Sequence, residues 1–521
     1  MSASATLISA PATHEPAARS DVGRRYAAAA VHTGIGGIVS RVLQGFAPII
    51  LARYLGPREY GLYALVLSLV GIVAGVSPLG QDTALEKFLP EYAIKNPARG
   101  GAILANTVIL VSGVLAVLCA AFFFAANWIA SALYHDASLT HVFQFSALLV
   151  LALSLFNLAS SATAGLQDFR SYSRAMIARS AAFLGLGWLG VWLLGLYGAI
   201  LGQLLASVLG LILLTARALT LTRQRFPRAL RPQFSGEILK EVFSFAFPAL
   251  LAGLLVAPAY WWANTLLARH AGFEQVGLFG VAFSVYQLIL LVPSTLSISA
   301  VSFLSESHTA ERHRFRNLVG TNVRLMWAIT LPLAVALTFL SPIIVRIVFG
   351  ASYGSAAPLA SIMSYVGLVV AIGSVIGNAA AGAGRMWHAF GINGLWLVAF
   401  WVVATLLVPR WGAQGLAIAF LASYFFLAGV FWVYSRFALM ANYDHARFLL
   451  ALTVLSALAA LVARRFLGGL PLIATGLLMV AMIMVMEWQF VIAPKERSEI
   501  RDLIQRLITY RRISVRVSEP L

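Results

Sequence analysis

The chain has 521 residues, of which 60% are hydrophobic and only 11% are charged, and its mean hydropathy is +0.86. A soluble domain carries about a quarter charged residues, so this composition excludes a soluble globular protein. The formal net charge is +18, and the single cysteine, Cys119, lies in an apolar run where a buried hydrophobic role is expected rather than a metal or redox role.

Residues 1–32 are predicted to be a disordered cytosolic tail. This segment is rich in Ala and Ser, carries Arg19, Arg24 and Arg25, and lacks the apolar core of a cleavable signal peptide. Apolar runs of about 20 residues then recur along nearly the whole chain, and each is long enough to cross the hydrocarbon core of a bilayer. The sequence therefore predicts an all-α polytopic membrane protein with about fourteen transmembrane helices.

The first span, 33–52, contains a charged residue. Arg41 lies about eight residues into it, a depth of about 12 Å at 1.5 Å per residue. An Arg at a helix centre costs about 2.5–3.5 kcal/mol on insertion scales, so such a residue generally faces protein or a water-filled cavity. The same helical face carries Gly34, Gly37, Gln44 and Pro48. We interpret Arg41 and Gln44 as contacts for an anionic ligand; the alternatives are an Arg that snorkels to the cytoplasmic surface and a structural ion pair.

A motif at the end of the first span recurs in the second half of the chain. Leu51-Ala52-Arg53-x-x-Gly56-x-x-x-x-Gly61 returns 216 positions later as Leu267-Ala268-Arg269-x-x-Gly272-x-x-x-x-Gly277, and Phe88-Leu89-Pro90-Glu91 is partly echoed by Phe303-Leu304-Ser305-Glu306. Six predicted spans separate the copies, so the halves share one orientation and form a parallel repeat. The glycines predict tight turns at the outer face. Arg53 and Arg269 precede these turns, either as capping or lipid-headgroup contacts or as twin cations at the outer mouth of a central cleft.

The repeat defines the domain organisation. We expect a first six-helix bundle at 33–219, a basic cytoplasmic linker at 220–242, a second six-helix bundle at 243–435, two additional transmembrane helices at 436–493, and a basic amphipathic cytoplasmic tail on anionic lipid at 494–521. Every predicted loop is too short to fold as a domain, so any chemistry must take place in or at the membrane.

The second half offers different polar groups at the matching register. Ala257 replaces the arginine of the first span, so an anion site would be asymmetric. Tyr260, Trp261 and Asn264 could instead offer stacking and hydrogen bonds to a sugar ring. An aromatic belt at the membrane interface explains Trp261 and Trp262 equally well. Arg179 and Arg324 lie near the cytoplasmic ends of their spans and could line an inner vestibule.

Most of the positive charge follows from topology. With the N-terminus inside, 29 of the 37 Lys and Arg residues fall on the cytoplasmic side and seven on the opposite side. This bias is the one that the positive-inside rule predicts, and it places both termini in the cytoplasm. The net charge therefore gives no reason to expect a nucleic-acid partner; membrane lipids are the expected one.

Acidic residues are nearly missing from the middle of the predicted spans. Glu241 and Glu487 sit at span ends. Carriers driven by protons or sodium usually hold the ion on a buried carboxylate, whereas an anion that leaves the cytoplasm moves down the membrane potential, about 2.3 kcal/mol per charge per 100 mV. Phosphate-binding loops and HExxH or Cys-x-x-Cys metal motifs do not occur in the sequence, so we expect a carrier without a cofactor rather than an enzyme.

A family resemblance is carried by three features. These are the interior Arg41, the run Leu51-Ala-Arg-Tyr-Leu-Gly-Pro-Arg-Glu-Tyr-Gly-Leu-Tyr63, and Phe88-Leu-Pro-Glu-Tyr92. They resemble polysaccharide biosynthesis proteins, the Wzx-type lipid-linked oligosaccharide flippases of the multidrug/oligosaccharidyl-lipid/polysaccharide (MOP) exporter superfamily. The resemblance implies two six-helix bundles around a cationic cavity and alternating access. It also implies movement of an undecaprenyl-pyrophosphate-linked glycan from the cytoplasmic to the periplasmic leaflet of a bacterial inner membrane, for O-antigen, capsule or exopolysaccharide synthesis.

Three other functions remain open on the sequence alone. A multidrug-type exporter of the same fold would favour buried carboxylates, and a membrane glycan polymerase would need a large outer loop with catalytic groups. A scaffold subunit without transport activity is the third. Polysaccharide polymerase and export proteins are further possible partners of a flippase.

Overall fold

The computed structural model describes residues 15–226, 232–310, 312–383, 385–439, 445–492, 494 and 497–498. Within these ranges every regular element is a helix. The α-helices are α1 (Glu15–Val76), α2 (Gln81–Lys95), α3 (Pro97–Trp128), α4 (Thr140–Gly165), α5 (Phe169–Arg225), α6 (Gly236–Gly253), α7 (Val256–Ala310), α8 (Arg312–Ile344), α9 (Ala356–Gly382), α10 (Met386–Phe437), α11 (Ala446–Phe466) and α12 (Gly469–Met486). Short π or 3₁₀ turns are η1 (Ile129–Leu133), η2 (Ala137–Leu139), η3 (Val345–Phe349), η4 (Ala351–Tyr353) and η5 (Glu487–Val491).

Ten helices in the described part of the chain are long and apolar enough to cross a membrane, which confirms a polytopic all-α protein. Several of them are too long for one crossing. The 57 residues of α5 would extend about 85 Å as a straight helix, against a hydrocarbon core of about 30 Å. The helices α1, α5, α7 and α10 each contain a glycine with non-helical backbone angles that divides the helix into two limbs. The count of fourteen crossings stays a prediction.

The parallel repeat is present in the backbone itself. Gly56 has φ 71° and ψ 172°, and its counterpart Gly272 has φ 84° and ψ 169°. Residues that have a side chain rarely adopt a positive φ, so glycine is favoured at both turns. A second pair, Gly195 and Gly412, shares φ values of 56° and 53° and an identical ψ of −132°. The π turns η1 and η3 recur at the same spacing in the chain.

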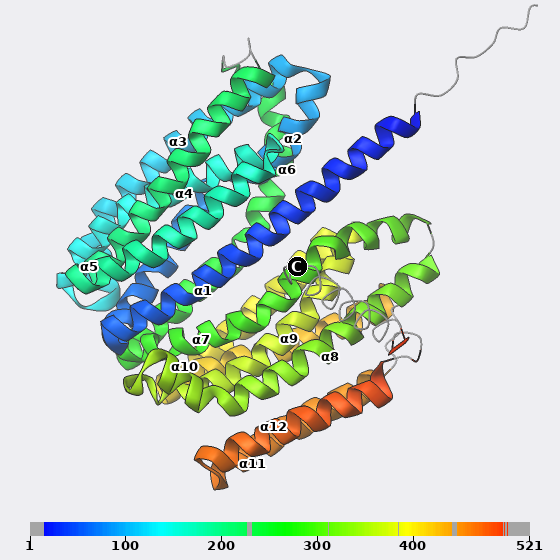
Figure 1. Cartoon of the computed structure of the whole chain (residues 1–521). Coiled ribbons are helices and arrows are strands. Elements are labelled where there is room, and N and C mark those ends of the chain that lie inside the picture. The colour runs from blue at the N-terminus through cyan, green and yellow to red at the C-terminus, as the bar shows by residue number, and fades with distance from the viewer. Residues whose placement is uncertain are drawn as a thin grey trace, which may run out of the picture.

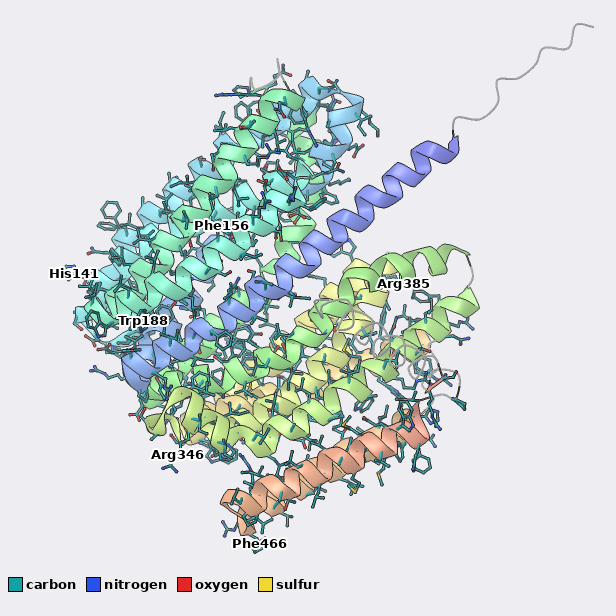
Figure 2. The ribbon with its side chains drawn as sticks, in the orientation of Figure 1. His141, Phe156, Trp188, Arg346, Arg385 and Phe466 are labelled. Atoms are coloured by element: carbon teal, nitrogen blue, oxygen red, sulfur yellow. The ribbon has the colours of Figure 1, made fainter. Side chains whose placement is uncertain are left out.

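The helices α2–α6 lie on one side of α1, and α7–α10 lie on the other (Figure 1). We call α1–α6 the first bundle and α7–α10 the second bundle. The two bundles lie together where α1 and α7 kink, which we call the joined end, and they diverge toward the N-terminal end of α1, which we call the splayed end. Figure 2 shows Trp188 and Arg346 toward the joined end and Arg385 toward the splayed end.

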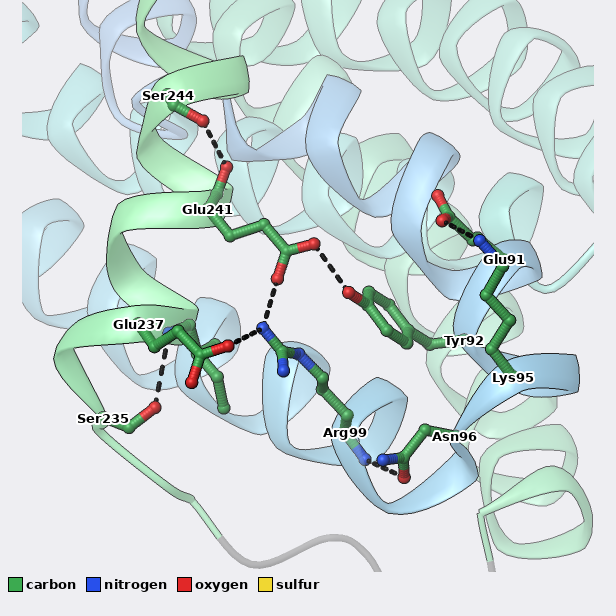
Figure 3. Close-up of polar contacts among 10 residues, drawn as sticks. Glu91, Tyr92, Lys95, Asn96, Arg99, Ser235, Glu237, Glu241 and Ser244 are labelled. Atoms are coloured by element: carbon green, nitrogen blue, oxygen red, sulfur yellow. Dashed lines mark hydrogen bonds and ion pairs between the residues drawn. The ribbon is translucent and has the colours of Figure 1, made fainter.

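The helix α6 differs from its predicted place. The sequence predicts that the second bundle begins at residue 243, but α6 packs on α2 of the first bundle, so closely that a Cβ at Gly80 would overlap the carbonyl oxygen of Ala246. A polar network reinforces this contact (Figure 3). Glu241 accepts hydrogen bonds from Arg99 at 2.6 Å and from Tyr92 at 2.6 Å. The chain enters the second bundle only after a break that follows α6.

The two C-terminal helices pack on α8. Trp327 Nε1 of α8 donates to Thr453 Oγ1 of α11 at 3.0 Å, and a Cβ at Gly476 of α12 would overlap the side chain of Phe339. Arg464, at the far end of α11, donates to Ser341 Oγ of α8. The pair is thus attached to the second bundle. Of the predicted N-terminal tail, residues 15–32 form the start of α1 and are helical rather than disordered, and residues 1–14 lie outside the described part. The predicted C-terminal tail, 494–521, lies outside it except for 494 and 497–498.

Candidate functional site

The middle of α1, residues 37–46, is largely uncovered. Arg41 is exposed, and so are Ile38 (48%) and Phe46 (52%), although all lie in a membrane-spanning helix between the two bundles. A Cβ at Gly37 or Gly45 would meet no atom within 4 Å. This stretch of α1 therefore has room beside it for a ligand or lipid.

Gln44 is held in place by two serines. Its amide nitrogen donates to Ser40 Oγ at 3.0 Å and to Ser180 Oγ of α5 at 3.1 Å. The two hydroxyls also lie 2.9 Å apart and are buried, with 4% and 1% exposure. These bonds hold α1 against α5 and use the amide nitrogen of Gln44, so its amide oxygen remains available to accept a hydrogen bond.

Arg179 lies next to Ser180 in the chain, and its environment is unusual for a cation. The guanidinium stacks over Phe156 of α4, 4.8 Å from the ring centroid, and Nε is buried with no hydrogen-bond partner among the described residues. Phe156 is buried, and Figure 2 labels it among the helices of the first bundle. A buried charge is costly unless it is paired, and no carboxylate in the described chain pairs with Arg179. An anion bound beside Arg179 would therefore supply the charge partner that the guanidinium lacks.

The structure brings two of the predicted site residues close to one another: Gln44 of α1 bonds to Ser180 of α5, the chain neighbour of Arg179. Arg41 lies on the uncovered stretch of α1, three residues before Gln44. The remaining predicted residues are Arg53 and Arg269, exposed beside the kinks of the joined end, and Tyr260, Asn264 and Arg324, half-buried in the second bundle. Their contacts with a substrate stay predictions.

Tyr260 has neighbours that the sequence did not reveal. Its ring packs 4.8 Å from Phe283 and 5.3 Å from Phe420, within an aromatic cluster of the second bundle. These neighbours restrict the space in which a sugar could stack on Tyr260. Asn264 lies one turn further along α7.

Phe156 and the Ser40–Ser180 pair are site residues that sequence reasoning missed. Phe156 is an ordinary apolar residue of a predicted span, and only the packing of α4 on α5 brings it to Arg179. Ser40 lies outside the helical face of Arg41, because residues three and four apart share a face and Ser40 is adjacent to Arg41 in the chain. A search for hydroxyls one turn before Gln44 would have found it, because residues four apart are neighbours on a helix.

Glu86 of α2 is an acidic group near this site, because Tyr172 of α5 lies within electrostatic range of both Glu86 and Arg41. Two other glutamates serve elsewhere in the fold. Glu487, at the end of α12, is 3% exposed and its Oε1 has no hydrogen-bond partner among the described residues. Glu241 belongs to the network that fastens α6. Burial raises the pKa of Glu241, but the hydrogen bonds from Tyr92 and Arg99 outweigh it and hold the pKa below its usual value.

Comparison with known proteins gives a consistent picture. Residues 50–358 match the profile of a family described as polysaccharide biosynthesis protein. The EPS I polysaccharide export inner membrane protein EpsE of Ralstonia solanacearum is 27% identical over 406 residues, 75% of this chain and 89% of that protein.

Two solved structures share the fold. The lipid II flippase MurJ in an inward closed conformation has a TM-score of 0.70 at 14% identity, over 91% of this chain and 100% of that one. An inward-facing multidrug resistance MATE family transporter of the MOP superfamily has a TM-score of 0.67 at 15% identity, over 76% of this chain and 94% of that one.

Proposed function

The chain belongs to the polysaccharide biosynthesis protein family, and we propose that it is a flippase for a lipid-linked oligosaccharide that carries a phosphate or pyrophosphate. The cargo would pass from the cytoplasmic to the periplasmic leaflet of a bacterial inner membrane by alternating access. An undecaprenyl-pyrophosphate-linked glycan of a surface polysaccharide is the expected substrate.

One observation carries this proposal. The uncovered segment of α1 presents Arg41, and Gln44 on the same segment bonds to Ser180, the chain neighbour of the buried Arg179. Neither arginine has an ion-pair partner in the described chain. A phosphate would supply the missing negative charge. The amide oxygen of Gln44 would accept a hydrogen bond from a sugar hydroxyl. The lipid tail would remain in the bilayer beside α1.

The orientation follows from the charge pattern. Both termini would be cytoplasmic, so the splayed end would face the cytoplasm and the joined end the periplasm. An inward conformation is supported by the TM-scores, which are 0.67 for the inward-facing MATE transporter and 0.55 for the outward-facing one. Each negative charge of the cargo would be driven outward by about 2.3 kcal/mol per 100 mV of membrane potential.

A multidrug exporter is the main alternative, because the fold is shared with such a transporter. Cationic drugs need carboxylates, whereas arginines dominate the site described above. The anionic cargo is therefore the better match to these side chains, and polysaccharide polymerase and export proteins are the expected partners downstream.

A test follows from where the cargo accumulates. Cells that lack the protein should hold lipid-linked repeat units in the cytoplasmic leaflet, where an impermeant glycosidase added outside cannot reach them. Re-expression of the chain should restore their exposure. Units that already face the periplasm in the deletion strain would contradict the proposal and point to a polymerase instead.

A further inference from the structure

At the joined end, α1 and α7 meet at two glycines that are related by the repeat, Gly61 and Gly277; we call this contact the seam. A Cβ at Gly61 of α1 would overlap the carbonyl oxygen of Phe273 of α7, and a Cβ at Gly277 would overlap the carbonyl oxygen of Pro57. The two contacts are reciprocal, so the backbones of α1 and α7 touch here without interlocking side chains. Surfaces that meet in this way can separate without rotamer changes.

Two tyrosines cross this seam in opposite directions. Tyr134, just after η1 of the first bundle, lies with its hydroxyl 2.9 Å from Thr265 Oγ1 of α7. Tyr353, the last residue of η4 in the second bundle, donates from its hydroxyl to the carbonyl oxygen of Ala52 of α1 at 2.9 Å. Both rings are buried, with 7% and 0% exposure.

The two contacts are alike in placement, although the 216-residue offset matches Tyr134 with Gly350 and Tyr353 with Ala137. Each tyrosine lies in the segment after a π turn of its own bundle and reaches the limb that precedes the kink in the other half. Each ring also meets an aromatic residue across the seam: Tyr134 lies 6.2 Å from Phe273, and Tyr353 lies 6.3 Å from Tyr60. The arrangement is therefore a pair of matched contacts about the seam.

We propose that Tyr134 and Tyr353 are two latches that hold the joined end shut in this conformation, and that both hydrogen bonds must break before the cargo can leave there. This inference rests on the alternating-access part of the proposed function. A neutral hydrogen bond makes a modest net contribution, so each latch is strong enough to bias the equilibrium between closed and open states and weak enough to release.

Cysteine accessibility tests the latches directly. In a Cys119→Ala background, Ala64→Cys places a thiol on α1 one turn deeper than Gly61, half-buried beside Gly280. The purified full-length protein, reconstituted without substrate, is treated from the joined side with a membrane-impermeant maleimide. Tyr134→Phe and Tyr353→Phe keep both rings and remove both hydroxyls. Loss of one modest hydrogen bond corresponds to about a two- to tenfold change in an equilibrium, so labelling should accelerate in each variant and most in the double variant.

Two controls make the result decisive. Tyr197→Phe changes an exposed tyrosine near the kink at Gly195 and should leave the rate unaltered. Arg346→Cys, on the exposed surface of η3, should label equally fast in all backgrounds. An unchanged rate in the double variant overturns the latches, and so does equal acceleration by Tyr197→Phe. Since no cargo is present, these outcomes are independent of whether the substrate is a lipid-linked glycan.

Discussion

Gly61 and Gly277, 216 positions apart in the chain, face each other's helix at the joined end, each against a backbone carbonyl of the other half. The relationship connects the repeat in the sequence to the closed state of the protein. Glycine is required at both positions by contact rather than by backbone angle, because each lies within a helical limb where alanine would otherwise be preferred.

Gly277→Ala should destabilise the closed joined end. The added methyl group would overlap the carbonyl oxygen of Pro57, and overpacking of this kind typically costs about 1–3 kcal/mol. A lower thermal stability and faster labelling of Ala64→Cys from the joined side would be the measured effects. Gly71→Ala is the matched control on α1, since its Cβ would meet no atom within 4 Å. Equal thermal stability and equal labelling of the two variants would contradict the close contact between Gly277 and Pro57.

Arg41→Ala and Arg41→Gln should abolish polysaccharide export, while Arg41→Lys retains part of it. The reason is that a positive charge at this exposed point of α1 is expected to attract the phosphate of the cargo. Export is measured as surface polysaccharide at equal protein level. Arg58→Ala, an exposed cation of the same helix beyond the kink, is the control. Normal polysaccharide in the Ala variant would remove Arg41 from the site.

Arg179→Met separates stability from transport. Methionine can keep the packing on Phe156 and removes a buried charge that lacks a carboxylate partner in the described chain. Replacing buried charge with an apolar group of similar volume is often neutral or stabilising by about 1–4 kcal/mol. The variant should therefore unfold at the same or a higher temperature in detergent, yet lose at least about tenfold in flipping rate, equivalent to about 1.4 kcal/mol. Unimpaired flipping would make Arg179 a structural residue.

Much of the fold could be predicted from the sequence because the bilayer restricts what an apolar run can do. Only helices and closed barrels satisfy their backbone groups in hydrocarbon, so runs of about 20 residues indicate helices directly. The repeat was visible because Gly56 and Gly272 occupy turns that exclude other residues. The second kink pair, Gly195 and Gly412, has fewer matching neighbours in the sequence and was not detected.

Packing partners could not be predicted in this way. The helix α6 follows the linker and carries the pattern of a spanning helix, yet its docking depends on a close approach at Gly80 and on charges brought from α2 and α3. Helical periodicity gives the face on which Tyr260 lies, but not the aromatic neighbours that cover it. The latch residues were missed for the same reason, since Tyr134 and Tyr353 find partners only across the seam.

The attachment of α6 should depend on pH through Glu241. Its folded pKa lies below the ordinary value of 4.5, so its contribution to stability is fully present above about pH 4.5 and is lost as the pH falls through the folded pKa. Glu241→Gln should lower the free energy of unfolding by about 1 kcal/mol at pH 7, because the bonds from Arg99 and Tyr92 lose their charge. Thermal unfolding of both proteins from pH 7 to pH 3.5 measures the difference, which should shrink below pH 4.5. Glu91→Gln, which breaks only the exposed pair with Lys95, is the control and should have a smaller effect. A difference that stays constant across this range would mean that the carboxylate charge of Glu241 does not hold α6 on the first bundle.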